Sequence, residues 1–296
     1  MKKVNQHGTL KKDTSETICI KNFDINLSKR FINWFIGFVE GQENTFIVNR
    51  RYLRFEINCL VKNQEIIYYI KRMLGFGEIR KLKFLDNVLI EFSVQDNIMD
   101  LLKLIKIFNG NLRSTIKNRY FQVFYKKLER KLKNSEFFNL LPSFDNSIKK
   151  IVFSNSWLLG YIDSRALFFG RWHKSKKLKN GKKIYLCCIF WDLNQEILLN
   201  LKNLFNTPCK IEEKQKWNLF FFKLVIDDIN SKNQIVEYLQ KFLLKTKNKK
   251  KKLKYWMILL NYEKIYINTG NENFEEVEKI LKKISLNVDE DELNKI

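Results

Sequence analysis

Two short stretches constrain the fold of this chain more than any other feature: Trp34 to Glu43 (WFIGFVEGQE) and Trp157 to Ala166 (WLLGYIDSRA). Each is an apolar, helix-like run that carries two small residues four positions apart, which are Gly37 and Gly41 in the first and Gly160 and Ser164 in the second. Four residues make just over one helical turn, so each helix presents a stripe almost without side chains. Two such stripes can cross with their backbones nearly in contact, which predicts a pseudo-twofold axis. The alternative is two unrelated core helices.

A common order of elements follows each stretch. After the first, alternating apolar and polar residues predict strand structure over 46–61, a helix over 63–74, a hairpin of strands 79–85 and 88–94, and a helix over 98–108. The tetrapeptide at 63–66, Asn-Gln-Glu-Ile, recurs at 194–197. This shared order predicts a duplication, with repeats at 27–142 and 143–267, an N-terminal extension at 1–26 and a C-terminal helical extension at 268–296. In that last extension an amphipathic helix over 273–284 precedes the acidic run 289–292.

The residues Trp34-Phe35-Ile36-Gly37-Phe38-Val39-Glu40-Gly41 and Trp157-Leu158-Leu159-Gly160-Tyr161-Ile162-Asp163-Ser164 resemble a known motif. It is that of the LAGLIDADG homing endonucleases and the maturases derived from them, counting the preceding Trp. The resemblance covers residues 27–267. It implies an α+β fold, a duplicated αββαββα pseudo-dimer with two saddle-shaped antiparallel sheets, in a monomer that binds nucleic acid.

In the resembled family the next position of each motif is an acid that binds the catalytic divalent metal, and here those positions are Gln42 and Arg165. An amide oxygen is a weak neutral ligand, and a guanidinium has no lone pair to offer. Glu43, one residue later, is an alternative ligand, but one residue rotates about 100° around a helix. We therefore predict that the chain is not an enzyme, with no catalytic residue, no metal and no cofactor.

The charge of the chain indicates a polyanionic partner. Its 55 Lys and Arg against 32 Asp and Glu give a net charge of +23, which favours nucleic acid over a membrane surface. The five cysteines are odd in number and lack metal-binding spacing, so we expect reduced thiols and no structural zinc. No apolar run reaches membrane-spanning length.

Two basic segments mark the second repeat, His173 to Lys183 (HKSKKLKNGKK), a hairpin turned at Asn180-Gly181, and Lys245 to Lys254 (KTKNKKKKLK), a loop before the last helix. The alternative for such runs is a solvated, disordered loop. In the resembled family the equivalent loops carry a Lys near the scissile phosphates, matching Lys117 and Lys247. The candidate nucleic-acid-binding residues are Arg50, Arg51, Arg54, Arg113, Lys117, Arg119, Lys174, Lys176, Lys177, Lys179, Lys182, Lys183, Lys245, Lys247, Lys249, Lys250, Lys251, Lys252 and Lys254.

Without the metal-binding acids, we predict that the protein binds structured RNA, as a component of an organellar (mitochondrial) ribosome where it contacts ribosomal proteins. The alternatives are a group I intron maturase or RNA chaperone, and a metal-dependent DNA homing endonuclease or DNA-binding relic. Lys, Asn, Ile, Leu and Phe abound while Ala occurs once and Pro twice, which indicates an A/T-rich genome. We therefore expect an organelle-encoded protein of the mitochondrial matrix; an A/T-rich bacterium or virus is the alternative.

Overall fold

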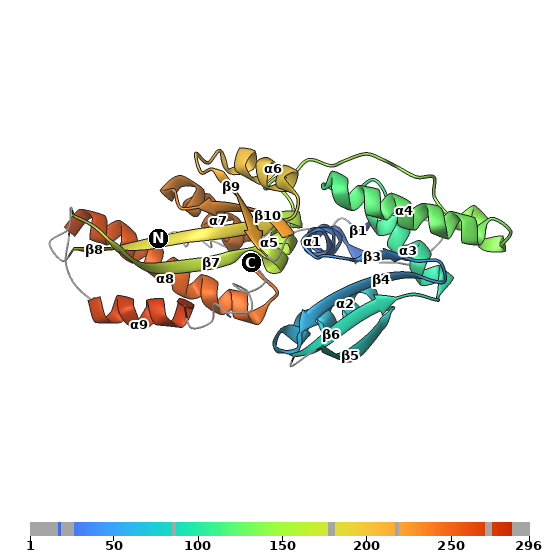
Figure 1. The fold of residues 1–296 in the computed structure, drawn as a ribbon, viewed down its shortest axis with the longest axis horizontal. Helices are drawn as coiled ribbons and strands as arrows, with labels where there is room; N and C mark the ends of the chain where they lie inside the picture. The colour runs from blue at the N-terminus through green and yellow to red at the C-terminus, as the bar shows by residue number, and fades with distance from the viewer. Residues whose placement is uncertain are drawn as a thin grey trace, which may run out of the picture.

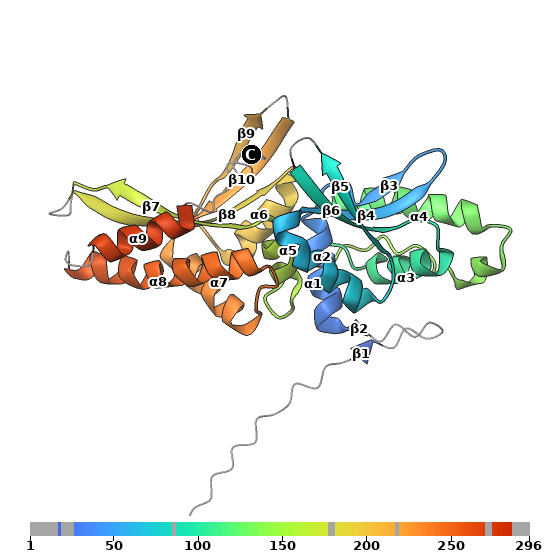
Figure 2. The same ribbon diagram turned by 90° about the horizontal axis from the view of Figure 1, so that it is seen from below.

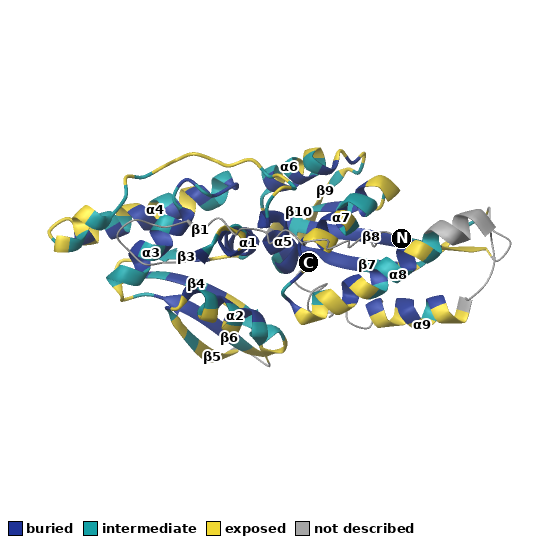
Figure 3. Cartoon of the chain, turned by 180° about the vertical axis from the view of Figure 1, so that it is seen from behind, coloured by how far each residue is buried: buried dark blue, intermediate teal, exposed yellow. Residues whose placement is uncertain are grey.

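The two small-residue stretches form helices α1 (Lys29–Glu40) and α5 (Trp157–Arg165), which lie against each other at the middle of the molecule (Figure 1). The structure is a computed structural model, and it describes residues 17–18, 27–84, 87–176, 181–216, 219–269 and 274–285. Helix α1 begins at Ser28, whose hydroxyl accepts the N–H of Phe31 at 3.2 Å. Both helices are buried on nearly all sides, which identifies them as the centre of the core (Figure 3).

The first repeat is built around a four-stranded antiparallel sheet in the order β3-β4-β6-β5. Its elements after α1 are β3 (Phe46–Val48), β4 (Leu53–Leu60), η1 (Val61–Asn63), α2 (Gln64–Leu74), β5 (Glu78–Phe84), β6 (Asn87–Val94), α3 (Ile98–Phe108) and α4 (Thr115–Leu132). Helix α2 ends at Gly75, whose φ of 75° is in the left-handed region that favours glycine. Two short antiparallel strands of two residues each, β1 (Thr17–Ile18) and β2 (Leu27–Ser28), precede α1.

The second repeat has the same plan, with a sheet in the order β7-β8-β10-β9. Its elements after α5 are β7 (Leu167–Lys174), β8 (Lys182–Asp192), α6 (Gln195–Phe205), β9 (Ile211–Lys216), β10 (Leu219–Ile226), α7 (Ile229–Lys241), α8 (Lys247–Thr269) and α9 (Phe274–Ser285). The short helix η2 (Glu136–Leu140) and an irregular segment up to Ser156 join the repeats. The prediction of an α+β fold with two four-stranded antiparallel sheets is confirmed.

Each sheet has one face packed against helices and one face turned away from them, which we call the open face. On β4, Leu53, Phe55 and Ile57 are buried in the core, and Arg54 and Glu56 alternate with them on the open face. The strands of both sheets rise on one side of the molecule, with α7, α8 and α9 below the second sheet (Figure 2). In the described part of the chain, no helix combines the length and apolarity needed to cross a bilayer.

The two basic segments differ in structure. Strands β7 and β8 pair out to Lys174 and Lys182, with a further hydrogen bond from the N–H of Ser175 to the carbonyl of Gly181, and residues 177–180 lie outside the described residues. The segment Lys245 to Lys254, predicted as a loop, is helical from Lys247 onward. The loop prediction was wrong because a buried acid, described below, caps the start of this helix.

Candidate nucleic-acid interface

The crossing of α1 and α5 has no room for side chains at its closest points. A Cβ atom on Gly37 would lie 2.0 Å from the carbonyl oxygen of Trp157, and one on Gly160 would lie 1.9 Å from that of Trp34. One turn later, a Cβ atom on Gly41 would lie 2.6 Å from the Ser164 hydroxyl oxygen. The backbones therefore pack directly on each other, which fixes how the two sheets are placed relative to one another.

Two buried acids tie the crossing together reciprocally. The indole N–H of Trp157 donates to Oε2 of Glu40 at 2.6 Å, and the indole N–H of Trp34 donates to Oδ2 of Asp163 at 3.0 Å. Each acid thus binds the tryptophan of the other repeat. Sequence reasoning missed this pairing, although its signal was present: in both stretches an acid follows the tryptophan by six residues.

The same acids set the start of the last large helix of each repeat. Oε1 of Glu40 accepts the backbone N–H groups of Arg113 and Ser114 at 2.7 and 2.6 Å, just before α4. Asp163 accepts those of Lys245 and Thr246 at 2.9 and 3.1 Å, just before α8. Burial raises the pKa of both carboxyls, against the opposing effect of these hydrogen bonds. Both acids are therefore fully occupied by structural contacts.

The two predicted metal positions lie together at the foot of the crossing. The side-chain amide of Gln42 donates to the Ser164 hydroxyl at 2.7 Å. Nη2 of Arg165 lies 3.1 Å from Oε1 of Glu43, and its guanidinium stacks 4.1 Å from the ring centroid of Trp191. These contacts link the two repeats, because Gln42 and Glu43 follow α1 whereas Ser164 and Arg165 end α5.

Lys117, in the first turn of α4, reaches the same place and donates from its ammonium to the carbonyl oxygen of Gln42. Burial and, after it, the charge of Arg165 lower the pKa of Lys117 to about 8, against the opposing effect of Asp192, Glu40 and Glu43. An amine with such a pKa exchanges its proton readily near neutral pH. Lys117 is therefore the residue of this centre best suited to proton transfer.

The counterpart of Lys117 in the second repeat is Lys249, and the match to Lys247 expected from the sequence is corrected here. Ser114 and Thr246 occupy equivalent places, bound to Glu40 and Asp163, and Lys117 and Lys249 each follow three residues later. Nζ of Lys249 donates to the carbonyl of Ile162 at 2.9 Å, next to the foot of α5. Lys247 is instead exposed.

The residues at this centre do not fit a divalent metal ion. Gln42 offers a neutral amide and Arg165 a cation, and neither neutralises the charge of Mg²⁺ as carboxylates do. Among the described residues, no three His, Cys, Asp or Glu side chains converge in a way that would hold a metal. We therefore derive no step through a metal.

The remaining predicted cations are placed unevenly. Arg54 lies on the open face of the first sheet, where Nε is 3.1 Å from Glu56 and Nη2 also pairs with Glu91. Arg50 and Arg51 are exposed in the turn between β3 and β4, and Arg119 is exposed on α4. Arg113 is buried against the Trp157 ring and donates to Asn33 and Asn111, which leaves it no solvent-facing group for a phosphate.

In the second repeat, the cations divide between the hairpin and α8. Lys174, Lys176, Lys182 and Lys183 are exposed at the β7–β8 end, and Lys177 and Lys179 lie outside the described residues. On α8 the exposed lysines are Lys247, Lys250, Lys251 and Lys254. Lys245 lies over the Tyr69 ring, and Lys252 is buried, so Lys252 does not fit the predicted phosphate contact.

Known proteins that this chain resembles are endonucleases. No protein-family model matches the sequence. A curated relative, the probable intron-encoded endonuclease 4 of Neurospora crassa, is 35% identical over 136 residues, or 46% of this chain. The chain spans 23% of the length of that relative.

Solved structures match over most of the chain. I-LtrWI, a LAGLIDADG homing endonuclease bound to target DNA, is 20% identical with a TM-score of 0.63 over 86% of this chain and 97% of its own. The LAGLIDADG meganuclease I-AabMI bound to uncleaved DNA is 18% identical with a TM-score of 0.65, over 84% and 98%. I-SmaMI bound to cleaved DNA is 15% identical with a TM-score of 0.64, over 85% and 95%. These likenesses show that the chain has the LAGLIDADG homing-endonuclease fold.

The comparisons contradict the prediction that the protein is not an enzyme. The sequence relative is named an endonuclease, and one of the matching structures is a homing endonuclease bound to cleaved DNA. The prediction gave decisive weight to two positions, Gln42 and Arg165. It considered Glu43 only as an alternative metal ligand and Lys117 only as a residue near the phosphates, and both lie at the foot of the crossing.

Proposed function

We propose that this protein is a homing-endonuclease-like protein that binds duplex DNA across the open faces of its two sheets. One observation carries the proposal: its two sheets, joined by the crossing of α1 and α5, match over 86% of the chain an endonuclease whose structure contains its target DNA. The endonuclease name of the Neurospora crassa relative supports the same assignment.

The charge of the molecule supports DNA as the ligand. The net charge of +23 favours a polyanion, and exposed cations lie on the strands and turns that border the open faces. Arg171 lies over the Tyr185 ring, 5.5 Å from its centroid, on the open face of the second sheet, and Lys223 lies on the same face in register with Trp191. These residues would contact phosphates, whereas the polar side chains of the first sheet are suited to base edges.

The middle of the bound duplex would lie at the foot of the crossing. There Lys117 supplies an amine that can accept or donate a proton, and Arg165 supplies a cation for a phosphate oxygen. In the strand scission named for the relatives, a water would attack the phosphorus and pass its proton to the neutral amine of Lys117, while the bond from phosphorus to the leaving strand oxygen breaks. Glu43, half-exposed beside Arg165, would move aside as the phosphate takes its place.

The prediction of structured RNA on a mitochondrial ribosome has no counterpart in the comparisons, and DNA is favoured over it. RNA therefore enters the test as the competing ligand. The intron-encoded relative supports the prediction that the chain originates in an organelle, and the mitochondrial matrix stays a prediction.

A selection experiment tests the proposal. The purified protein is incubated with a random duplex library, bound duplexes are recovered and sequenced, and a folded RNA of equal length is added as competitor. We expect one duplex sequence to be enriched and to resist the RNA. Enrichment of no duplex, or displacement by the RNA at equal concentration, would contradict the proposal.

The selected duplex then tests the centre. Strand scission is followed on sequencing gels for the wild type, for Lys117→Met, and for the matched control Lys126→Met, an exposed lysine of the same helix. We expect cuts at the middle of the duplex from the wild type and the control, and their loss in Lys117→Met with binding retained. Equal cutting by Lys117→Met would remove Lys117 from the reaction.

A further inference from the structure

Helix α8 carries a stripe of lysines that faces away from the sheet. Lys247, Lys250, Lys251 and Lys254 are all exposed and recur at intervals of three, one and three, so they share one helical face. The opposite side of the helix, with Leu253, Trp256 and Leu260, is buried. The four residues, which we call the lysine stripe, therefore point away from the open face of the second sheet.

Within the described residues, no carboxylate forms an ion pair with the side chains of the lysine stripe, although Oε1 of Glu65 accepts the backbone N–H of Lys247 at 3.2 Å. Like charges three and four positions apart on a helix repel one another. A negatively charged partner would relieve this repulsion.

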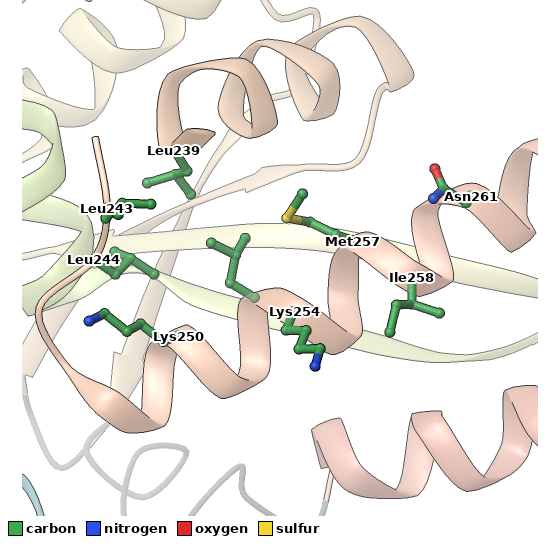
Figure 4. Close-up of a pocket in the computed structure, with 9 residues that line it drawn as sticks. Leu239, Leu243, Leu244, Lys250, Lys254, Met257, Ile258 and Asn261 are labelled. Atoms are coloured by element: carbon green, nitrogen blue, oxygen red, sulfur yellow. The ribbon is translucent and has the colours of Figure 1, made fainter. Parts of the chain in front are cut away.

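An apolar groove of about 520 Å³ runs beside the lysine stripe, between α7 and α8 (Figure 4). Its walls are Leu239, Leu243, Leu244, Met257 and Ile258, and Lys250 and Lys254 stand at its rim. Leu243 is 62% exposed, and with its apolar neighbours it forms a contiguous apolar surface. The surface therefore fits a segment with both acidic and aliphatic side chains.

Helix α9 leads the chain toward this surface. The hydroxyl of Tyr262 donates to Glu276 at 2.9 Å, and Nζ of Lys283 lies 5.4 Å from the ring centroid of Tyr255. From Glu276 to Lys283 the contacts advance seven residues along α9, while on α8 they go back seven residues, from Tyr262 to Tyr255. The two helices therefore run antiparallel. Helix α9 therefore ends, at Ser285, beside the end of α8 that carries the lysine stripe.

The sequence after α9 has the chemistry that this surface requires. Residues 286–296 read LNVDEDELNKI, with four consecutive acids flanked by Val288 and Leu293. Eleven residues span at most about 36 Å when extended. The seven-residue distance from Lys254 to Lys247 is only about 10 Å along a helix. The acidic run is therefore within reach of every lysine of the stripe.

We propose that residues 286–296 of this chain dock on the outward face of α8, with Asp289 to Glu292 against the lysine stripe and the flanking aliphatic residues in the groove. This docking neutralises a basic surface that lies on the far side of the molecule from the open faces. Nucleic acid is then directed to the open faces. The inference is independent of which nucleic acid binds there.

Zero-length carbodiimide cross-linking of the full-length protein, followed by peptide mass spectrometry, tests the docking directly. We expect cross-links within one molecule from Asp289–Glu292 to Lys250, Lys251 or Lys254. They should disappear at about 1 M salt, where the screening length falls to about 3 Å. The internal controls are Lys126 and Lys131, which are also exposed, on α4, the corresponding helix of the first repeat.

A charge-reversal pair makes the test independent of lysine reactivity. Lys250→Glu, Lys251→Glu and Lys254→Glu remove the reacting amines, so the informative result is restoration of the cross-links when these changes are combined with Asp289→Lys, Glu290→Lys, Asp291→Lys and Glu292→Lys. Circular dichroism checks that α8 stays folded in both variants. Three results would overturn the proposal. The wild-type tail could cross-link to α4 or to the open faces, its cross-link yield to α8 could be no higher than its yield to the control lysines, or the reversed charges could fail to restore the cross-links.

Discussion

The open face of the first sheet is balanced in charge, whereas the open face of the second sheet is basic. On the first, Arg54 pairs with Glu56 and Glu91, and Arg80 pairs with Glu78 at 2.6 Å. On the second, Glu212 pairs with Lys214 at 3.0 Å opposite Lys223, and Asp227 accepts from Tyr185, but with Arg171 and Lys183 the cations outnumber these acids. The duplication has therefore kept the crossing of α1 and α5 while the two open faces have diverged.

This difference suggests that the two repeats contribute differently to nucleic-acid affinity and to sequence specificity. Phosphate contacts supply salt-dependent affinity, and base contacts supply specificity. Arginines held by carboxylates, as on the first face, are oriented but contribute little net charge. We infer that the second repeat provides more of the affinity and the first repeat more of the sequence preference.

The largest expected effect concerns the crossing, the part that both repeats share. Gly37→Val and Gly160→Val each place side-chain atoms within about 2 Å of a backbone carbonyl of the facing helix. We expect each to cost more than about 3 kcal/mol, at or beyond the upper end of ordinary overpacking. Thermal unfolding measures this cost. Gly41→Ala is the graded control, because its Cβ atom would meet a hydroxyl group instead of backbone, and equal stability of all three variants with the wild type would refute the crossing.

Next in size is the affinity supplied by the second face. Arg171→Gln with Lys223→Gln should flatten the dependence of log K for duplex binding on log salt concentration by about 1.8, from two phosphate contacts at about 0.9 each. Titrations at several salt concentrations provide the slope. Lys126→Gln with Lys131→Gln on α4 is the control pair, and an equal change in both pairs would mean that charge acts without regard to face.

The first face should show the opposite response. Arg54→Gln, made together with Glu91→Gln so that no buried carboxylate is left unpaired, should leave the salt slope nearly unchanged. We expect the preference for the selected sequence at the affected base pair to weaken by about 1 to 3 kcal/mol. Binding to single-base variants of the selected duplex measures this. A large fall in slope with unchanged preference would reverse the proposed division between the repeats.

Lys117 lies at the foot of the crossing, between the two repeats, and its titration predicts a pH dependence of stability. Its pKa falls from the ordinary 10.5 to about 8 on folding. Between pH 8 and pH 10.5 the unfolded state binds more protons than the folded state, so Lys117 makes the free energy of unfolding increase as pH rises. Below pH 8 the folded protein bears the full cost of burying the charged ammonium. Lys117→Met should therefore stabilise the protein at pH 7 by about 1 to 2 kcal/mol, after allowance for partial exposure. The gain should vanish near pH 10.5 in chemical denaturation, and a gain independent of pH would show that Lys117 is not buried as a charge.

The smallest effect is expected from the lysine stripe. Lys250→Gln, Lys251→Gln and Lys254→Gln together should change the salt slope of duplex binding by less than about 0.5, since the stripe faces away from the open faces. A change of two or more would place these lysines on the bound DNA and would contradict their assignment to the acidic tail.

Much of the fold could be predicted from local patterns. The hairpin expected at 79–85 and 88–94 is β5 and β6, and the helix expected over 98–108 is α3, because alternation and helical spacing in these segments match their burial. The small stripes of Gly37 and Gly160 were recognisable because a helix crossing without side chains leaves a spacing of four in the sequence.

The remaining features depend on contacts between residues distant in sequence. The Glu40–Trp157 hydrogen bond joins residues 117 positions apart, and it is the pairing of Asp163 with Lys245 and Thr246 that starts α8 where a basic loop was expected. Burial of Arg113 and Lys252 is likewise set by tertiary packing. The chemistry of the centre was misjudged for the same reason, since Lys117 and Arg165 meet only through the crossing.

The most direct test of the account is a hydroxyl-radical footprint on the selected duplex, compared between the wild type and the Arg171→Gln, Lys223→Gln variant. We predict a continuous protected region in which two halves flank a centre, and the variant should lose protection in one half only. Protection of a single half by the wild type, or equal loss in both halves of the variant, would contradict binding across both open faces.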